Sequence, residues 1–303
     1  MIASDRTGTN EFRVRLMSPL GHYPTASFQT ESAALVISPE ICFSIVRVPH
    51  EDWSFSEVDI VTETELPLYG SILLAGEAGD PHLYPYPTIH SVLFKTDSVG
   101  KITDSLILES KSNLIEDIQN NATEWPTNIL HKPPCLGGAN YELFKSSSSD
   151  GIRLDLLHQL EIASPVILRG VSCLLRGRMA FQHPEFGEAA CMFLWIALDA
   201  AHSLVLQRLR KSGVTNPSSK DAARYFEKMS GYGAEWEKFF ETDYENRIQA
   251  IHPANRFGVE AIPPFLADDF LELSASLIPL YEHFVMYFPN DFPSEDETEQ
   301  NSK

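Results

Sequence analysis

The chain has 303 residues, of which 43% are hydrophobic and 21% charged, so it can build the core of one large domain or two ordinary ones. Its formal net charge at pH 7 is −19. Such an acidic chain repels nucleic acid on average, so any contact with RNA or DNA must come from a local basic patch. The four cysteines form no close pair in the sequence, which is not a zinc pattern and favours a reducing cytoplasm.

Residues 1–145 are typical of a β-rich domain that senses or binds a partner. "FRVRLM", residues 12–17, alternates apolar and polar side chains as a half-buried strand does. Runs rich in β-branched and aromatic residues predict further strands. These runs cover residues 33–38, 42–48, 58–74 and 90–94. A short helix is expected within residues 115–125.

The polar run "KSSSSDG", residues 145–151, predicts a linker. Residues 152–290 then have helical patterns with short links, which predicts an all-α bundle and an α+β protein overall. The expected helices cover residues 164–181, 184–213, 218–231, 233–253 and about 268–288. Ser164 and the Ser218-x-x-Asp221 capping box mark helix starts, and Gly213 marks a helix end. Residues 291–303 form an acidic tail that is expected to be disordered.

The most apolar run is "AACMFLWIALDAAHSLVL", residues 189–206. It is short for a membrane span, so we expect a buried helix of a cytoplasmic protein. Asp199 lies inside this run, where a buried charge is costly unless it is paired. Arg247 on a neighbouring helix is a natural partner. The alternative is that Asp199 lies at the edge of the helix and faces water.

Arg247 and His252 lie in "YENRIQAIHP", where Pro253 stops the helix at the histidine. At 3.6 residues per turn the two side chains point about 140° apart, and a long arginine can still curl towards the histidine. The negative end of the helix favours an imidazolium that donates a proton, and a guanidinium fork fits phosphate. The pair suits RNA cleavage by the ribose 2′-hydroxyl without a metal. The alternative is that Arg247 pairs with nearby carboxylates and His252 only caps the helix.

The C-terminal half resembles a HEPN domain, the helical module of many RNA-cleaving toxins and antiviral defence proteins. The family hallmark is an arginine, four to six residues, and a histidine on a late helix, which Arg247 and His252 match. An acidic residue in an earlier apolar helix corresponds to Asp199. The stretch around Tyr244 and Asn246 is similar to that of abortive-infection relatives.

The resemblance implies a metal-independent endoribonuclease, with no cofactor, that works in a bacterial defence or toxin system. It also implies a homodimer in which two motifs face one cleft, and a possible antitoxin or other protein partner. Active relatives often carry a polar residue directly after the arginine, whereas this chain has Ile248 there and Asn246 before it. The alternative is therefore a non-catalytic module that binds RNA or protein.

Two further groups are weaker candidates. Several basic residues can supply the local patch that RNA needs, although a solvated helix face explains them equally well. They are Arg169, Arg176, Arg178, Arg208, Arg210, Lys211 and Arg256. Asp80, His82 and His90 lie in a proline-rich loop whose irregular spacing favours a rigid turn over a metal site.

Overall fold

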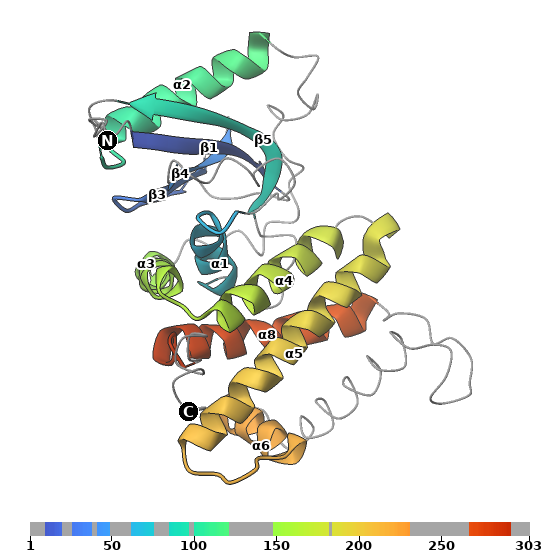
Figure 1. The fold of residues 1–303 in the computed structure, drawn as a ribbon. Helices are drawn as coiled ribbons and strands as arrows, with labels where there is room; N and C mark the ends of the chain where they lie inside the picture. The colour runs from blue at the N-terminus through green and yellow to red at the C-terminus, as the bar shows by residue number, and fades with distance from the viewer. Residues whose placement is uncertain are drawn as a thin grey trace, which may run out of the picture. The chain divides into compact units, whose positions relative to one another are not determined.

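The computed structural model describes residues 10–19, 26–37, 41–48, 62–75, 85–96, 100–120, 148–181, 184–230 and 267–291. The chain divides into two compact units. Unit 1 comprises Met1–Tyr69 and His82–Leu154, and unit 2 comprises Gly70–Pro81 and Asp155–Lys303. Strands occur in the N-terminal part and helices prevail elsewhere, as expected for an α+β protein (Figure 1).

Unit 1 holds a five-stranded antiparallel sheet with the strand order β2-β3-β4-β1-β5. Its strands are β1 (Asn10–Pro19), β2 (Ala26–Gln29), β3 (Ala33–Ile37), β4 (Cys42–Val48) and β5 (Pro85–Thr96). In the register, Val14 of β1 lies opposite Ile45 of β4 on one side and Val92 of β5 on the other. The predicted strands at residues 12–17, 42–48 and 90–94 are therefore confirmed, as is the strand at 33–38 except for residue 38, which lies outside the described residues.

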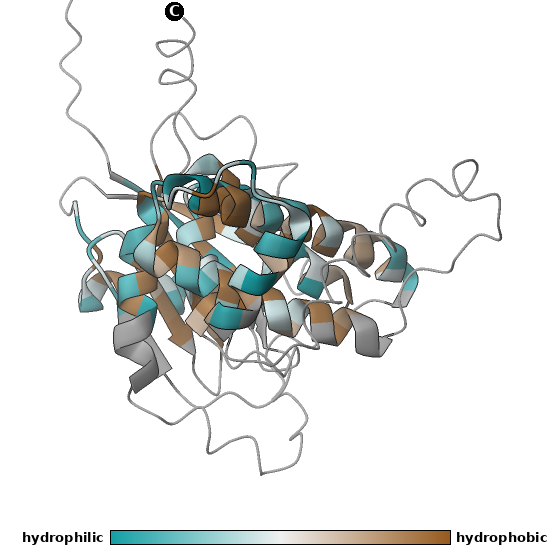
Figure 2. Ribbon diagram, turned by 90° about the horizontal axis from the view of Figure 1, so that it is seen from below, coloured by the Kyte–Doolittle hydropathy of each residue, from teal (hydrophilic) through white to brown (hydrophobic). Residues whose placement is uncertain are grey.

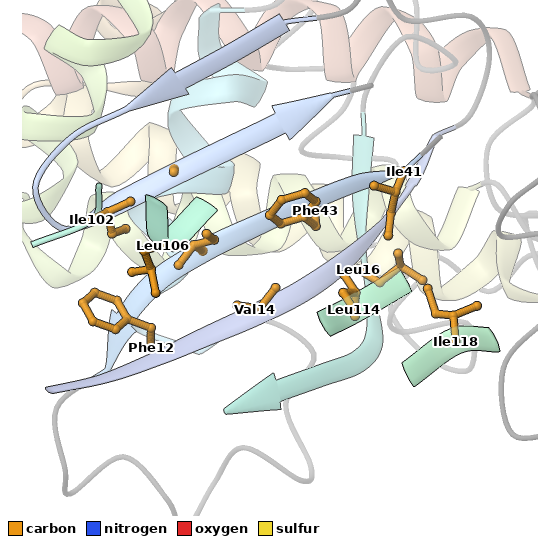
Figure 3. Close-up of a cluster of buried hydrophobic side chains, with 11 residues drawn as sticks. Phe12, Val14, Leu16, Ile41, Phe43, Ile102, Leu106, Leu114 and Ile118 are labelled. Atoms are coloured by element: carbon orange, nitrogen blue, oxygen red, sulfur yellow. The ribbon is translucent and has the colours of Figure 1, made fainter. Parts of the chain in front are cut away.

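Helix α2 (Asp104–Asn120) covers one face of the sheet. Its buried residues recur every four positions, which puts them on one side of the helix. They pack on alternate residues of β1 and β4, and this core is drawn in Figure 3. The core comprises Phe12, Val14, Leu16, Ala34, Ile41, Phe43, Ile45, Ile102, Leu106, Leu114 and Ile118. The short helix expected within residues 115–125 is thus the end of a longer one.

The opposite face of β1 carries Glu11, Arg13, Arg15 and Met17, and all four are buried. The prediction of a half-buried strand at residues 12–17 is therefore wrong for its polar face. The arginines do not reach water because both of them pair with a buried carboxylate, Glu65.

The prediction of a strand over residues 66–74 is also wrong, because Leu66–Ala75 form helix α1. The preceding turn is a capping box. The hydroxyl of Thr62 donates to the carboxylate of Glu65 at 2.9 Å, and the Thr62 N–H lies 3.4 Å from the same oxygen. Helix α1 itself carries apolar residues on all of its sides. Its sequence therefore lacks the alternation of apolar and polar residues at helical spacing that would have identified it as a helix.

Unit 2 is helical in its described part. Its helices are α4 (Pro165–Phe181), the 3-10 turn η3 (Pro184–Phe186), α5 (Gly187–Lys211), α6 (Ser219–Ser230) and α8 (Ala267–Tyr287). All four long helices match predictions. Helix α3 (Ser148–Glu161) begins inside the predicted linker, and it forms because Leu156, Leu157 and Leu160 bury one of its sides.

Helices α4 and α5 pack along their length, and α8 contacts both of them (Figure 1). Gly170 of α4 lies against Tyr281 of α8. A Cβ atom at this position would lie 1.9 Å from the hydroxyl of Tyr281, which donates to the carbonyl of Ala197 at 2.5 Å. Polar and apolar segments alternate along the helices, as expected where each has a buried and a solvated side (Figure 2).

Candidate functional site

The Arg247-to-His252 motif lies outside the described residues, as do Tyr244, Asn246 and Arg256. The structure describes the helices on either side of it, since α6 ends at Ser230 and α8 begins at Ala267. In the sequence the motif therefore falls within the residues of unit 2, between two of its helices.

Asp199 lies on α5 as predicted, but its side chain is exposed. The prediction of a buried Asp199 is wrong, and the alternative of a solvent-facing helix edge is correct. The apolar run around Asp199 covers the buried side and the exposed side of α5. Leu198 and Ala201 are buried, while Ile196 is 37% exposed. Replacement of an exposed carboxylate does not leave a buried arginine without a counter-charge, so it does not cause the large loss of folding stability that a buried pair would. A pairing of Asp199 with Arg247 lies outside the described residues.

The arginines of α4 do not form one surface patch. Arg169 is exposed and Arg176 is half-buried, but Arg178 is only 3% exposed. The guanidinium of Arg178 donates to the hydroxyl of Ser274 on α8 at 3.3 Å. Arg178 is therefore a packing residue, and its assignment to RNA binding is wrong.

A cationic and aromatic cluster lies where α5 ends. It is built by the last turn of α5, the middle of α6 and the end of α8, and we call it the α5-end cluster. Its members are Arg208, Lys211, Tyr225, His283, Phe284, Tyr287, Phe288 and Asp291. Because three helices contribute, no local sequence pattern predicts that these residues meet.

Local capping positions these elements. Helix α5 ends in a Schellman motif, in which the Val214 N–H donates to the Leu209 carbonyl and the Gly213 N–H to the Arg210 carbonyl. Gly213 has a φ of +93°, a conformation that glycine adopts without strain. Helix α6 begins at the predicted capping box, since the Ser218 N–H donates to the Asp221 carboxylate at 2.8 Å.

Cations converge on one carboxylate in the α5-end cluster. The Lys211 ammonium is 3.0 Å from the Asp291 carboxylate, and the Arg208 guanidinium is 3.7 Å from its other oxygen, Oδ2. That separation is too long for a hydrogen bond, and Oδ2 has no hydrogen-bond partner although the atom is buried. The guanidinium carbon lies 3.7 Å from the centre of the Phe288 ring, which holds the cation in a fixed plane.

His283 and Tyr225 form the second half of the cluster, with the Tyr225 hydroxyl 3.2 Å from His283 Nε2. Burial lowers the pKa of His283, and the positive charge of Arg208 lowers it further, so the imidazole is neutral at pH 7. Burial raises the pKa of Tyr225 against the opposing effect of Arg208, so the phenol keeps its proton. The cluster can therefore bind an anion through its cations and exchange hydrogen bonds through neutral groups.

Unit 1 contains a second polar cluster, which has no access to solvent. Glu65 accepts from Arg15 at 2.6 and 2.9 Å, from Arg13 at 3.2 Å and from the Tyr69 hydroxyl at 3.1 Å. Burial alone would raise the pKa of Glu65, but the hydrogen bonds and charge of Arg15, then the charge of Arg13, outweigh it and lower the pKa. These side chains are at most 3% exposed in the salt bridges, which makes the cluster part of the fold and not a binding site.

No group of three metal-binding side chains occurs among the residues that the structure describes. Asp80 and His82 lie outside that part of the chain, and only the backbone of His90 is described, in β5. Cys42, Cys173 and Cys191 are buried and form no disulfide, as expected of plain core residues, while Cys135 lies outside the described residues. Burial raises the pKa of the Cys42 thiol, so it is not an activated nucleophile.

By length and composition, α5 is the one described helix that could cross a membrane. Half of its apolar stretch is buried, and α4, α6 and α8 pack against the helix. Comparisons with protein-family models, with curated proteins and with solved structures found no match to this chain.

Proposed function

We propose that unit 2 is a HEPN-like domain that cleaves RNA through Arg247 and His252 without a metal. The observation that carries the proposal is the Arg-x4-His spacing directly before Pro253, in a part of the sequence that lies between α6 and α8 of a helical unit. The long apolar helix α5, with an acidic residue at Asp199, precedes the motif in the order that the family resemblance implies. A defence or toxin role, and a homodimer that brings two motifs together, belong to the same proposal.

In this mechanism the ribose 2′-hydroxyl attacks phosphorus and the 5′-oxygen of the next nucleotide leaves. His252 moves protons between these two oxygens, and Arg247 stabilises the charge that develops on the phosphate. An arginine suits the second role because its planar fork of donors matches two phosphate oxygens at once. Asp199 lies on the exposed side of α5 and not in the core.

The alternative is a module that binds RNA or protein without cleaving it. It is favoured by Ile248, an apolar residue where active relatives often carry a polar one. Under this alternative Arg247 and His252 have structural roles and take no part in chemistry.

The two functions differ in one assay. Purified full-length protein is incubated with mixed RNA in EDTA, and the ends of the products are analysed. We expect cleavage with 2′,3′-cyclic phosphate or 3′-phosphate ends, while DNA survives because it lacks the attacking hydroxyl. His252→Ala should abolish cleavage, and Arg247→Lys should strongly reduce it, because a point charge lacks the fork.

The matched control is His158→Ala, since His158 is exposed on α3 and pairs only weakly with Glu161 at 3.7 Å. This variant should cleave as the wild type does. A wild type that cuts no RNA, or a His252→Ala variant that cuts as well as the wild type, contradicts the ribonuclease and leaves the binding module.

A further inference from the structure

We propose that the α5-end cluster is a contact surface for single-stranded RNA, where Arg208 and Lys211 hold a phosphate and Tyr287 stacks on a base. This deepens the proposed function, because it names a place where the RNA strand is held apart from Arg247 and His252. It assigns no chemistry to the cluster, so it stands equally if the domain binds RNA without cleaving it.

The first argument is the accessibility of the cations to solvent. A guanidinium carries five N–H donors, and Asp291 approaches Arg208 no closer than 3.7 Å. The side chains of Arg208 and Lys211 keep 32% and 40% exposure, so a solvent-borne anion can reach both. A phosphate has more acceptor oxygens than one carboxylate and can engage Arg208 at hydrogen-bond distance.

The second argument is the aromatic surface beside these cations. Tyr287 is 69% exposed, the highest value among the large hydrophobic side chains of the described residues. Its ring centre lies 5.2 Å from that of His283, which contacts Phe288 at 5.5 Å, and Phe288 lies beneath Arg208. Exposed aromatic rings next to phosphate-binding cations are how proteins hold unpaired bases.

The third argument is local charge. Arg208, Arg210 and Lys211 put three positive charges in the last turn of α5, where Arg208 and Lys211 share the carboxylate of Asp291. In a chain of net charge −19 this is a local concentration of positive charge that can attract the phosphates of an RNA strand. Asp291 lies beside the two cations that would hold a phosphate, so its carboxylate competes with a phosphate for them.

The experiment measures binding of the wild-type chain to fluorescent 2′-O-methyl oligouridine, whose blocked hydroxyl prevents cleavage. Tyr287→Ala should weaken binding about fivefold or more, the usual loss when one stacked base is removed. Lys211→Gln should reduce the slope of log affinity against log salt by about 0.7, one phosphate contact on a single strand. Asp291→Asn should strengthen binding, because it removes the competing charge.

Two controls match these variants. Lys101→Gln removes an exposed lysine that also pairs with one carboxylate, Glu31, and Phe186→Ala removes another exposed ring. Both should bind as the wild type does. Thermal melts identify any variant that is unfolded at the assay temperature, and Tyr287→Ser then replaces Tyr287→Ala.

Wild-type affinity in the Tyr287 and Lys211 variants overturns the proposal. An Asp291→Asn variant with a lower melting temperature and no gain in affinity also overturns the proposal. Asp291 then only stabilises the packing of α5 beside the end of α8. Equal competition by inorganic polyphosphate in wild type and Tyr287→Ala overturns the stacking contact. Wild-type protein that binds through this surface but never cleaves RNA removes the ribonuclease and leaves the surface intact.

Discussion

Glu65 is a fully enclosed carboxylate at the start of α1, and two buried arginines depend on it. Its two oxygens accept from Arg13, Arg15, Thr62 and Tyr69, so the charge of the guanidinium groups is neutralised where water cannot reach them. A buried charge is tolerated only when its partner is present and well placed. Glu65 therefore joins the start of α1 to the inner strand β1.

We predict that Glu65→Gln strongly destabilises the protein. The amide keeps the shape of the side chain but leaves Arg13 and Arg15 buried without a counter-charge, which costs about 3–5 kcal/mol. Urea denaturation measures the change in the free energy of unfolding. The control is Glu63→Gln, an exposed neighbour in the same turn, which should change it by less than about 0.5 kcal/mol. Equal effects of the two substitutions would contradict the role given to Glu65.

Among the contacts between helices, the one between α4 and α8 depends on the lack of a side chain at Gly170. Gly170 lets the ring of Tyr281 approach the α4 backbone, and the Tyr281 hydroxyl then reaches the carbonyl of Ala197 on α5. Three helices meet at this point, and only the absence of a side chain at residue 170 allows it.

We predict that Gly170→Ala lowers the melting temperature. Alanine favours a helix by about 1 kcal/mol over glycine, but the clash with a fully buried ring should outweigh this gain by about 1–3 kcal/mol. Gly187→Ala is the matched control, since no atom lies within 4 Å of a Cβ at that position of α5. It should leave the melting temperature unchanged or raise it. If both variants melt alike, the close approach of Tyr281 does not limit stability.

The helices of unit 2 were predictable because their ends are set by local chemistry. The capping box at Ser218, the glycine at residue 213 and the proline at residue 165 each act within one turn of the chain. Helix α1 was missed because it is apolar on all sides, although the Thr62-x-x-Glu65 capping box and Pro67 in its first turn were visible signals. Periodicity identifies a helix only where one side of it faces water.

The candidate site divides in the same way. The Arg247 and His252 spacing is local and was found in the sequence, whereas the meeting of Arg208, Tyr225 and His283 requires three helices to pack. The burial of individual side chains also could not be predicted from the composition of the surrounding sequence. Arg178 is buried and Asp199 exposed, the reverse of what their surroundings in the sequence suggested, because rotation about the helix axis decides exposure.

For the whole molecule, charge sets the limit on RNA binding. A net charge of −19 repels a phosphate backbone, and the repulsion between exposed charges extends over about one Debye length, roughly 10 Å at 0.1 M salt. Residues 294–303 contain four acidic residues and one lysine, a net charge of −3. They follow shortly after Asp291, which pairs with Lys211 in the α5-end cluster.

We predict that deleting residues 294–303 strengthens binding of single-stranded RNA to the α5-end cluster. The deletion changes the net charge from −19 to −16, and it removes negative charge from the part of the chain directly after the cluster. The gain in affinity should be on the order of two- to tenfold at low salt and should disappear at high salt, because salt screens the interactions between exposed charges.

A full-length variant with Glu295, Glu297 and Glu299 changed to Gln and Asp296 to Asn separates the effect of tail charge from that of tail length. It should match the deletion in fluorescence anisotropy titrations. A deletion that strengthens binding while the neutralised tail does not would mean that the segment hinders RNA by its bulk. No gain in either protein would mean that the tail charge does not act on this surface.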